Sequence, residues 1–261
     1  MLSFTDAQIN TWLTTFLWPL VRILGVLMAA PVFGHRATPT RVKIGLGVFI
    51  ALVLVPTLPA PPDIALGSWQ GLLVLVRQIL IGIAIGFVIR IAFAAVDAAG
   101  EIVGLQMGLG FATFFDPQSA GQSLVLARFF NMLAVLLFLA VDGHLLLLDV
   151  LARSFQTLPV GASPLGAAGF RSVATFGSII FAIGLQLALP LIAIMLMTNL
   201  ALGILTRAAP QLNIFAIGFP ITLSVGLIAL TLSLPYFTVQ FGRIIQNSLE
   251  AATTVVKNLG L

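Results

Sequence analysis

The chain has 261 residues, of which 60% are hydrophobic and only 8% are charged. Soluble domains carry about 25% charged residues, so this composition and a mean hydropathy of +1.16 exclude an ordinary soluble protein. The formal net charge is +4 and the basic residues are spread along the chain, so no nucleic-acid surface is predicted. There is no cysteine, which excludes disulfides, cysteine-bound metals and thiol chemistry.

The length and apolar content predict an all-α, polytopic membrane protein. A membrane crossing takes about 20 residues, so about six apolar helices are expected, followed by a C-terminal amphipathic helix. Residues 11–32 form the first predicted helix, with Arg22 near its middle. An arginine there is expected to pair inside an assembly or to extend to the membrane surface, with a specific functional role as the alternative. Residues 44–58 form a second, short helix that ends in a proline cluster.

A third apolar run covers residues 72–89 and contains the G-x-x-x-G pair Gly82 and Gly86. Such pairs are typical of close helix packing. At about 100° per residue, a helix that continues past this run places Arg90, Asp97 and Glu101 in one narrow stripe. Two interpretations stay open for this stripe: an internal salt-bridge network between Arg90 and the two acids, or the wall of an aqueous path.

The segment 101–121, EIVGLQMGLGFATFFDPQSAG, combines small residues with bulky aromatic ones. Glycines recur every fourth residue before and within it, and this spacing favours close approach of another helix; they are Gly100, Gly104 and Gly108. Gly108 and Gly110 also weaken the helix just before Phe111, Phe114 and Phe115. The pattern predicts a tightly packed helix that breaks into an apolar loop at a protected site.

The next predicted helix covers the apolar run 124–141. Asp142-Gly143-His144 then interrupts the apolar sequence and is expected to form a turn or a kink. Residues 154–171 are expected to form a loop between two halves. Residues 176–205 and 215–234 are predicted spans, the former with Pro190 inside. The amphipathic tail from Tyr236 is expected to lie on the membrane surface or on a partner.

No motif for chemistry is found. There is no P-loop, no complete dinucleotide fingerprint, no zinc-protease motif and no serine elbow. With two histidines in the chain, far apart, no metal site is expected. The sequence predicts a non-enzyme without a cofactor.

Several motifs, in this order and spacing, resemble the flagellar biosynthesis protein FliR family. They are Arg22 with Ala30-Pro-Val-Phe-Gly34, Pro39 and Lys43; Glu101-x-x-Gly-x-Gln-x-Gly-x-Gly-Phe with Asp116-Pro and Gly121; Asp142-Gly-His144; Ser154-Phe155 with Leu158-Pro159; and Asn199 through Arg207-x-x-Pro-Gln-Leu-Asn213 to Gly218-Phe-Pro220. The resemblance covers nearly the whole chain.

The resemblance implies a subunit of the flagellar type III secretion export gate in the bacterial inner membrane, at the base of the basal body. There it would join FliP and FliQ, contact FlhB, and help to form a pore for unfolded flagellar subunits, surrounded by membrane lipid. The family's plug loop corresponds here to Gly108, Gly110, Phe111, Phe114 and Phe115. The resemblance also implies one FliR-type domain over residues 1–261, with a FliP-like half (1–160) and a FliQ-like half (161–261).

Two alternatives remain open. One is the same role in an injectisome that exports virulence effectors. The other is a stand-alone secondary transporter, a class that often has inverted repeats and broken helices. Pro190 is compatible with a broken helix, but the two halves of this sequence show no convincing repeat.

Overall fold

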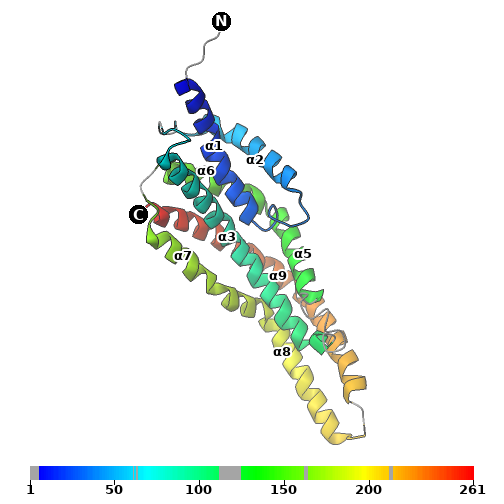
Figure 1. Ribbon diagram of the computed structural model, residues 1–261. Coiled ribbons are helices and arrows are strands. Elements are labelled where there is room, and N and C mark those ends of the chain that lie inside the picture. Colours follow the sequence, from blue (N-terminus) through cyan, green and yellow to red (C-terminus); the bar gives the residue numbers. More distant parts are fainter. Residues whose placement is uncertain (1–5, 61, 63, 112–124, 162–163, 212–213) are drawn as a thin grey trace. The chain divides into compact units, whose positions relative to one another are not determined.

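The computed structural model describes residues 6–60, 62, 64–111, 125–161, 164–211 and 214–261. Every regular element within these residues is a helix (Figure 1). In chain order, the helices are α1 (Asp6–Ala29), α2 (Thr40–Leu54), η1 (Val55–Thr57), α3 (Trp69–Gln106), η2 (Leu109–Phe111), α5 (Val125–Ala140), α6 (Gly143–Thr157), α7 (Ala167–Gly177), α8 (Ile179–Ala208) and α9 (Ile214–Leu259).

Five stretches of helix within the described residues are long and apolar enough to cross a membrane. A sixth is added if α5 and α6, which are bent against each other, count as one span. The five stretches are Asn10–Ala29, Thr40–Thr57, Trp69–Gln106, Ala167–Ala208 and Ile217–Leu259. This confirms the predicted all-α polytopic class with about six apolar helices.

The structure agrees with one expectation about helix bounds and contradicts another. The helix after residue 72 does continue through the charged stripe, since α3 is unbroken from Trp69 to Gln106. The predicted loop 154–171 is wrong at both ends, because α6 extends to Thr157 and α7 begins at Ala167. The small residues of α7 resemble a loop in sequence. Alanine nevertheless has the highest helix propensity, and Gly169 packs directly under the side chain of Leu259.

The amphipathic tail is the end of α9, a helix of 46 residues that continues through Pro220 and Pro235. Its predicted apolar face is buried within the chain: Phe241 is 0% exposed and Ala252 is 0% exposed. The expectation that this face lies on a membrane surface or on a partner is therefore wrong. The last turn of α9 is fixed instead by a hydrogen bond that the Gly166 amide donates to the Leu259 carbonyl over 2.9 Å.

Contacts divide the chain into two compact units. The first comprises Met1–Ile91, Asp142–Gly177 and Ile245–Leu261, and the second comprises Ala92–Val141 and Ser178–Ile244. Both units therefore combine segments that are distant in sequence. The division into a FliP-like half (1–160) and a FliQ-like half (161–261) is a separate matter, and it stays a prediction.

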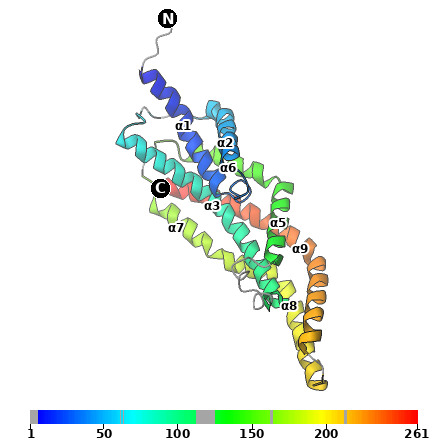
Figure 2. The same cartoon turned by 45° about the vertical axis from the view of Figure 1, so that its right-hand side comes forward.

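In the second unit, α8 runs beside the first part of α9 in both ribbon views (Figures 1 and 2).

The second unit also contains a core of aromatic rings. Phe93 of α3 makes edge-on contacts with Phe138 of α5 at 5.7 Å and with Phe241 of α9 at 5.8 Å between ring centroids. Phe130 meets Phe237 in the same way at 5.0 Å. Edge-to-face pairs of this kind are favoured geometries, so they join α3, α5 and α9.

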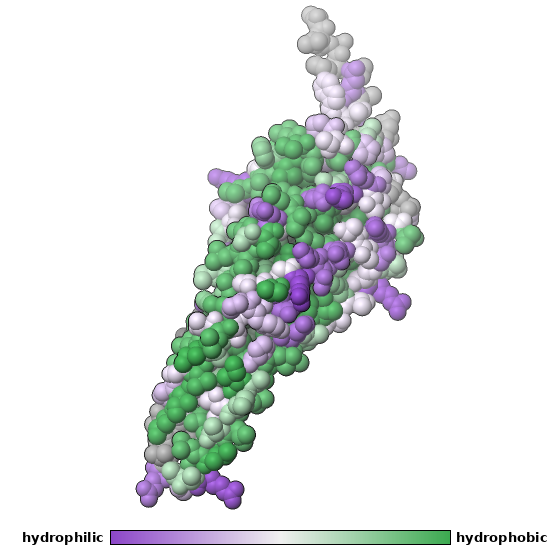
Figure 3. Space-filling model, turned by 180° about the vertical axis from the view of Figure 1, so that it is seen from behind, coloured by the Kyte–Doolittle hydropathy of each residue, from purple (hydrophilic) through white to green (hydrophobic). Residues whose placement is uncertain are grey.

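Much of the outer surface is apolar. In Figure 3, hydrophobic side chains cover broad areas of the face shown, with hydrophilic residues between them. On α8, Phe181 is 78% exposed and Met197 is 72% exposed. Surfaces of this extent mark contact with lipid or with other proteins.

Candidate functional site

The predicted break after the glycine-rich helix is present. α3 ends at Gln106, and the Gly108 amide donates to the Leu105 carbonyl over 3.0 Å. Gly108 has φ +82°, a left-handed conformation that glycine adopts without a steric penalty. The chain then turns into the short helix η2 at Leu109–Phe111. Gly108 therefore redirects the backbone immediately before the phenylalanine segment.

The residue before this turn is held by α9. Met107 is 0% exposed, and a Cβ added to Gly226 would lie 2.6 Å from the side chain of Met107. The Thr222 hydroxyl oxygen lies 3.4 Å from the Met107 carbonyl oxygen and 3.0 Å from that of Phe219. The Thr222 hydroxyl has one proton to donate, so the hydrogen bond is shared between these two carbonyl oxygens. The start of the predicted loop is thus fixed on α9, and the sequence alone did not indicate this contact.

The predicted plug residues lie only partly within the described chain. Gly110 is half-buried, with Leu105 next to it. The backbone of Phe111 closes η2. Phe114 and Phe115 lie outside the described residues, so their proposed role stays a prediction.

The polar stripe on α3 is not an ion-pair network in the described chain. Arg90 and Glu101 are both exposed, and no ion pair joins Arg90 to either acid. Asp97 is half-buried and accepts a hydrogen bond from the side-chain amide of Asn131 on α5 over 2.7 Å. Asp97 is therefore satisfied within the second unit, whereas Arg90 and Glu101 have no side-chain partner in the part of the chain that the structure describes.

The glycines of the G-x-x-x-G pair lie where α1 crosses α3. A Cβ on Gly82 would overlap the carbonyl oxygen of Arg22, and the Cα of Gly25 would be only 3.0 Å away. A Cβ on Gly86 would lie 2.8 Å from the carbonyl oxygen of Val26. The two backbones approach so closely that only glycine fits.

Gly100 of α3 allows the close approach of a second helix, α5. A Cβ on Gly100 would come within 2.6 Å of the Cα of Ala127 on α5. Gly104, one turn on, is buried as well. Together with the bond between Asp97 and Asn131, this contact fixes α5 along the last turns of α3.

Arg22 is enclosed within the first unit. It is 0% exposed and donates three hydrogen bonds: to the Gln78 side-chain oxygen over 2.7 Å, to the Ser154 hydroxyl over 3.1 Å and to the Leu158 carbonyl over 2.8 Å. Its guanidinium carbon lies 4.1 Å from the centre of the Phe155 ring, a cation–π distance. The expected pairing of Arg22 thus occurs within the chain itself. Gln78, a polar residue in an apolar run, was the one sequence signal of a partner.

Nothing in the described residues forms a metal site, since no group of three or more metal-binding side chains gathers there. His144 has a buried Nδ1 without a hydrogen-bond partner in the described chain. Asp142 adopts φ 55° and marks the break between α5 and α6. The motif therefore acts as the predicted turn.

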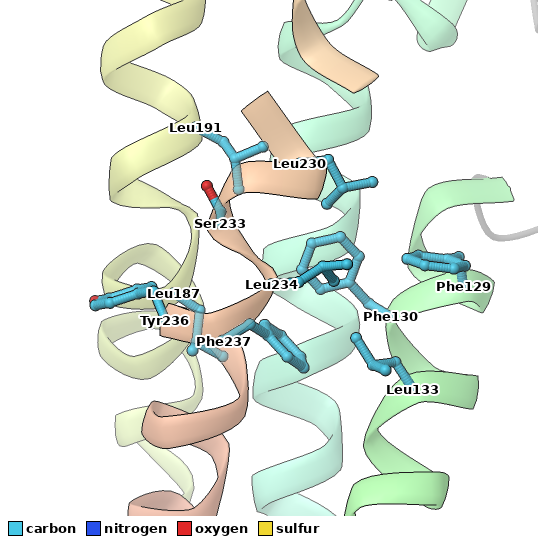
Figure 4. A pocket seen from close by; sticks show the side chains of 10 residues that line it. All are labelled: Phe129, Phe130, Leu133, Leu187, Leu191, Leu230, Ser233, Leu234, Tyr236 and Phe237. Carbon is cyan, nitrogen blue, oxygen red and sulfur yellow. The ribbon is translucent and has the colours of Figure 1, made fainter. Parts of the chain in front are cut away.

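Two cavities among the described residues were considered as candidate sites. The one between α5, α8 and α9 is lined by Phe129, Phe237 and neighbouring leucines (Figure 4) and holds about 10 Å³. That is about the space of one water molecule, so it is a packing gap. The other, of about 110 Å³, lies between Pro19, Pro59 and Phe155. Neither has the convergent polar groups of a small-molecule site.

Comparison with known proteins identifies relatives over almost the entire chain. The family model described as bacterial export proteins, family 1, matches residues 13–248. The flagellar biosynthetic protein FliR of Pectobacterium carotovorum subsp. carotovorum is 52% identical over 235 residues, covering 90% of each chain. FliR of Escherichia coli (strain K12) is 51% identical over the same share. FliR of Bacillus subtilis (strain 168) is 32% identical over 94% of this chain and 96% of its own.

Proposed function

Because the chain belongs to family 1 of the bacterial export proteins, the family of its FliR relatives, we propose that it is a subunit of the flagellar type III secretion export gate. In this role it joins FliP and FliQ, with FlhB as a neighbour, in the inner membrane at the base of the basal body. Unfolded flagellar subunits are the cargo of the pore they form. The names of the relatives are flagellar, which favours this system over an injectisome.

The segment that starts at Gly108 is the proposed plug of the pore. The observation that carries this proposal is the fixed base of the segment: Met107 is buried against Gly226, and Gly108 follows in a left-handed conformation. The buried Met107 and the glycine turn together give the segment a fixed starting point on α9. The phenylalanines at 111, 114 and 115 supply the apolar bulk.

The proposed mechanism is closure by dewetting. Apolar rings that narrow a pore expel water, and ions do not pass a dry constriction. Displacement of the segment about Gly108 re-admits water and opens the path for an unfolded chain. No covalent step and no cofactor is part of this function.

Secretion and conductance test the two parts of the proposal separately. A strain that lacks this chain is expected to secrete no flagellar subunits, and the wild-type chain is expected to restore secretion. Replacing Phe111, Phe114 and Phe115 together by Ala is expected to make the inner membrane leak ions, while Phe49→Ala on α2 leaves conductance unchanged. Full secretion without the chain contradicts the subunit role. Wild-type conductance of the triple variant contradicts the plug.

A further inference from the structure

The turn that joins α1 to α2, within the first unit, carries three cations. Arg36 and Arg41 are exposed and Lys43 is half-buried. The Lys43 ammonium donates a hydrogen bond over 3.0 Å to the carbonyl of His35, and the Ala37 amide donates one over 3.2 Å to Nδ1 of His35. These bonds fold the turn back on itself and bring Lys43 to the residue that precedes Arg36. We call Arg36, Arg41 and Lys43 the basic turn.

The basic turn has no acidic partner in the described chain. Residues 7–62 contain neither Asp nor Glu. No ion pair joins a carboxylate of the described residues to any of the three cations. α2 also begins at Thr40 without an acidic residue in its first turn. Three positive charges gathered in one short segment attract anions, so the basic turn is suited to bind an anion from outside the chain.

Beyond the basic turn, α2 presents only apolar side chains outward. α2 lies beside α1 (Figure 1), and a Cβ added to Gly47 would lie 2.6 Å from the side chain of Leu24. The outer face is exposed, by 65% at Phe49 and by 60% at Leu52. Only 17% of the span Thr40–Thr57 is buried, the smallest share among the five candidate spans. The surface of α2 thus has positive charges at one end and apolar groups along the rest.

The end of the first unit opposite the basic turn carries exposed tryptophans. Trp12 is 62% exposed and Trp69 is 71% exposed. The Leu66 amide donates to the Asn10 side-chain oxygen over 3.3 Å, so α3 begins at the same end as α1. From Trp12 to Ala29, 17 steps of about 1.5 Å make roughly 26 Å, close to the roughly 30 Å of a bilayer's hydrocarbon core. Exposed tryptophans are typical of one membrane interface, which places the basic turn at the lipid head groups of the other.

We infer that the basic turn and the outer face of α2 form a binding site for an anionic phospholipid. Arg36, Arg41 and Lys43 bind the phosphate of the head group, and the acyl chains lie along α2. Basic residues next to a membrane span attract anionic lipids, and the apolar face continues directly from the charges. A soluble anion matches only the charges, and an acidic protein segment finds no polar group along α2. This site requires only a membrane around α1 and α2, so it is independent of the export role.

Quenching by brominated lipids tests the occupant in the purified complex. The chain has no cysteine, so a fluorophore on Phe49→Cys reports from one position of it once the cysteines of co-purified subunits are replaced. Dibrominated phosphatidylglycerol, which is anionic, is compared with dibrominated phosphatidylcholine, which has no net charge. Phosphatidylglycerol is expected to quench at about hundredfold lower concentration, since each cation contributes about fivefold. A label on Leu145→Cys of α6, where the side chain is 54% exposed, is expected to show no such preference.

Neutralising the cations tests their role. Arg36→Gln, Arg41→Gln and Lys43→Gln are each expected to raise the phosphatidylglycerol concentration for half-quenching about fivefold, and the triple variant about hundredfold. Arg36→Lys with Arg41→Lys keeps both charges and is expected to keep the preference. Arg171→Gln is the matched control, because Arg171 is an exposed cation on α7 of the same unit.

Four results overturn the inference. Equal quenching by both lipids in the wild-type complex means that the basic turn selects no anionic lipid. An unchanged preference in the triple variant means that other residues bind the head group. Displacement of phosphatidylglycerol by an equal concentration of glycerol phosphate means that the acyl chains add nothing. No quenching at residue 49 by either lipid means that a protein covers α2. None of these results bears on secretion, which tests the export role separately.

Discussion

The Arg22 guanidinium donates a hydrogen bond over 2.8 Å to the main-chain carbonyl of Leu158, 136 residues further along the chain. Since the same side chain also bonds Gln78 and Ser154, one residue joins α1, α3 and the end of α6. Ser154 in turn donates to the carbonyl of Leu151 over 2.6 Å. Neutral groups of its own unit thus surround the guanidinium charge, and no carboxylate among the described residues accepts a hydrogen bond from it.

Arg22→Ala is expected to destabilise the first unit severely. Each hydrogen bond to a charged group contributes about 1.5–3 kcal/mol, and the partners left behind remain buried. A total loss of about 3 kcal/mol or more follows, since Arg22 is fully buried. Denaturant titration of the purified complex, followed through tryptophan fluorescence, measures it.

Two further variants separate charge from geometry. Arg22→Lys keeps the charge but loses the planar fork of donors, so it is expected to fall between wild type and Arg22→Ala. Ser154→Ala removes one acceptor and is expected to cost about 1 kcal/mol. Wild-type stability of Arg22→Lys contradicts the role of the fork.

Much of the fold was predictable because apolar helices have a strong periodic signal. A helix that continues past residue 89 places Arg90, Asp97 and Glu101 in one stripe, and α3 does continue. The Gly108 turn followed from two weakened helix positions. Side-chain partners across the chain were not predictable. Nothing local to Arg22 indicates Gln78 or Leu158, because the three meet only after α1, α3 and α6 pack.

The errors have a physical cause as well. α7 contains two glycines, which are poor helix formers, but its alanines have the highest helix propensity, and Gly169 packs against Leu259. α9 continues through Pro235, because a proline removes only one backbone bond and packing on both sides compensates. Tertiary contacts thus override local preferences at these points.

Gly82→Ala is expected to destabilise the chain, whereas Gly45→Ala is not. The new methyl group at residue 82 overlaps the Arg22 carbonyl oxygen, a backbone atom that moves only with its helix. Overpacking of this kind costs about 1–3 kcal/mol. A Cβ at Gly45 of α2 meets nothing within 4 Å, so only the better helix propensity of Ala remains, worth about 0.5–1 kcal/mol of stabilisation.

The same denaturant titration compares the two glycine variants. The midpoint for Gly82→Ala is expected below that of wild type, and the midpoint for Gly45→Ala at or above it. Equal midpoints for both variants mean that α1 and α3 do not approach each other at Gly82 as the structure shows.

Gly108→Ala is expected to disturb the base of the proposed plug. Its φ of +82° is unfavourable for residues with a Cβ, by roughly 1–2 kcal/mol. Gly108→Asn is expected to be milder, because Asn visits this region more readily, and Gly108→Val the most severe. Secretion of flagellar subunits should follow the order Gly, Asn, Ala, Val. Equal secretion by Val and Asn variants contradicts a left-handed requirement.

The contact between Met107 and Gly226 offers a paired test of how α9 positions the proposed plug. Gly226→Leu forces the side chain of Met107 out of its place, because even a single Cβ there lies 2.6 Å from it. The segment after Gly108 then shifts, and the membrane is expected to conduct ions at rest. Met107→Ala vacates the space, so the double variant is expected to recover most of the closed state. Gly242→Leu is the control on the same helix, since a Cβ at Gly242 meets nothing within 4 Å. If the double variant leaks as much as Gly226→Leu alone, the loss of closure does not act through Met107.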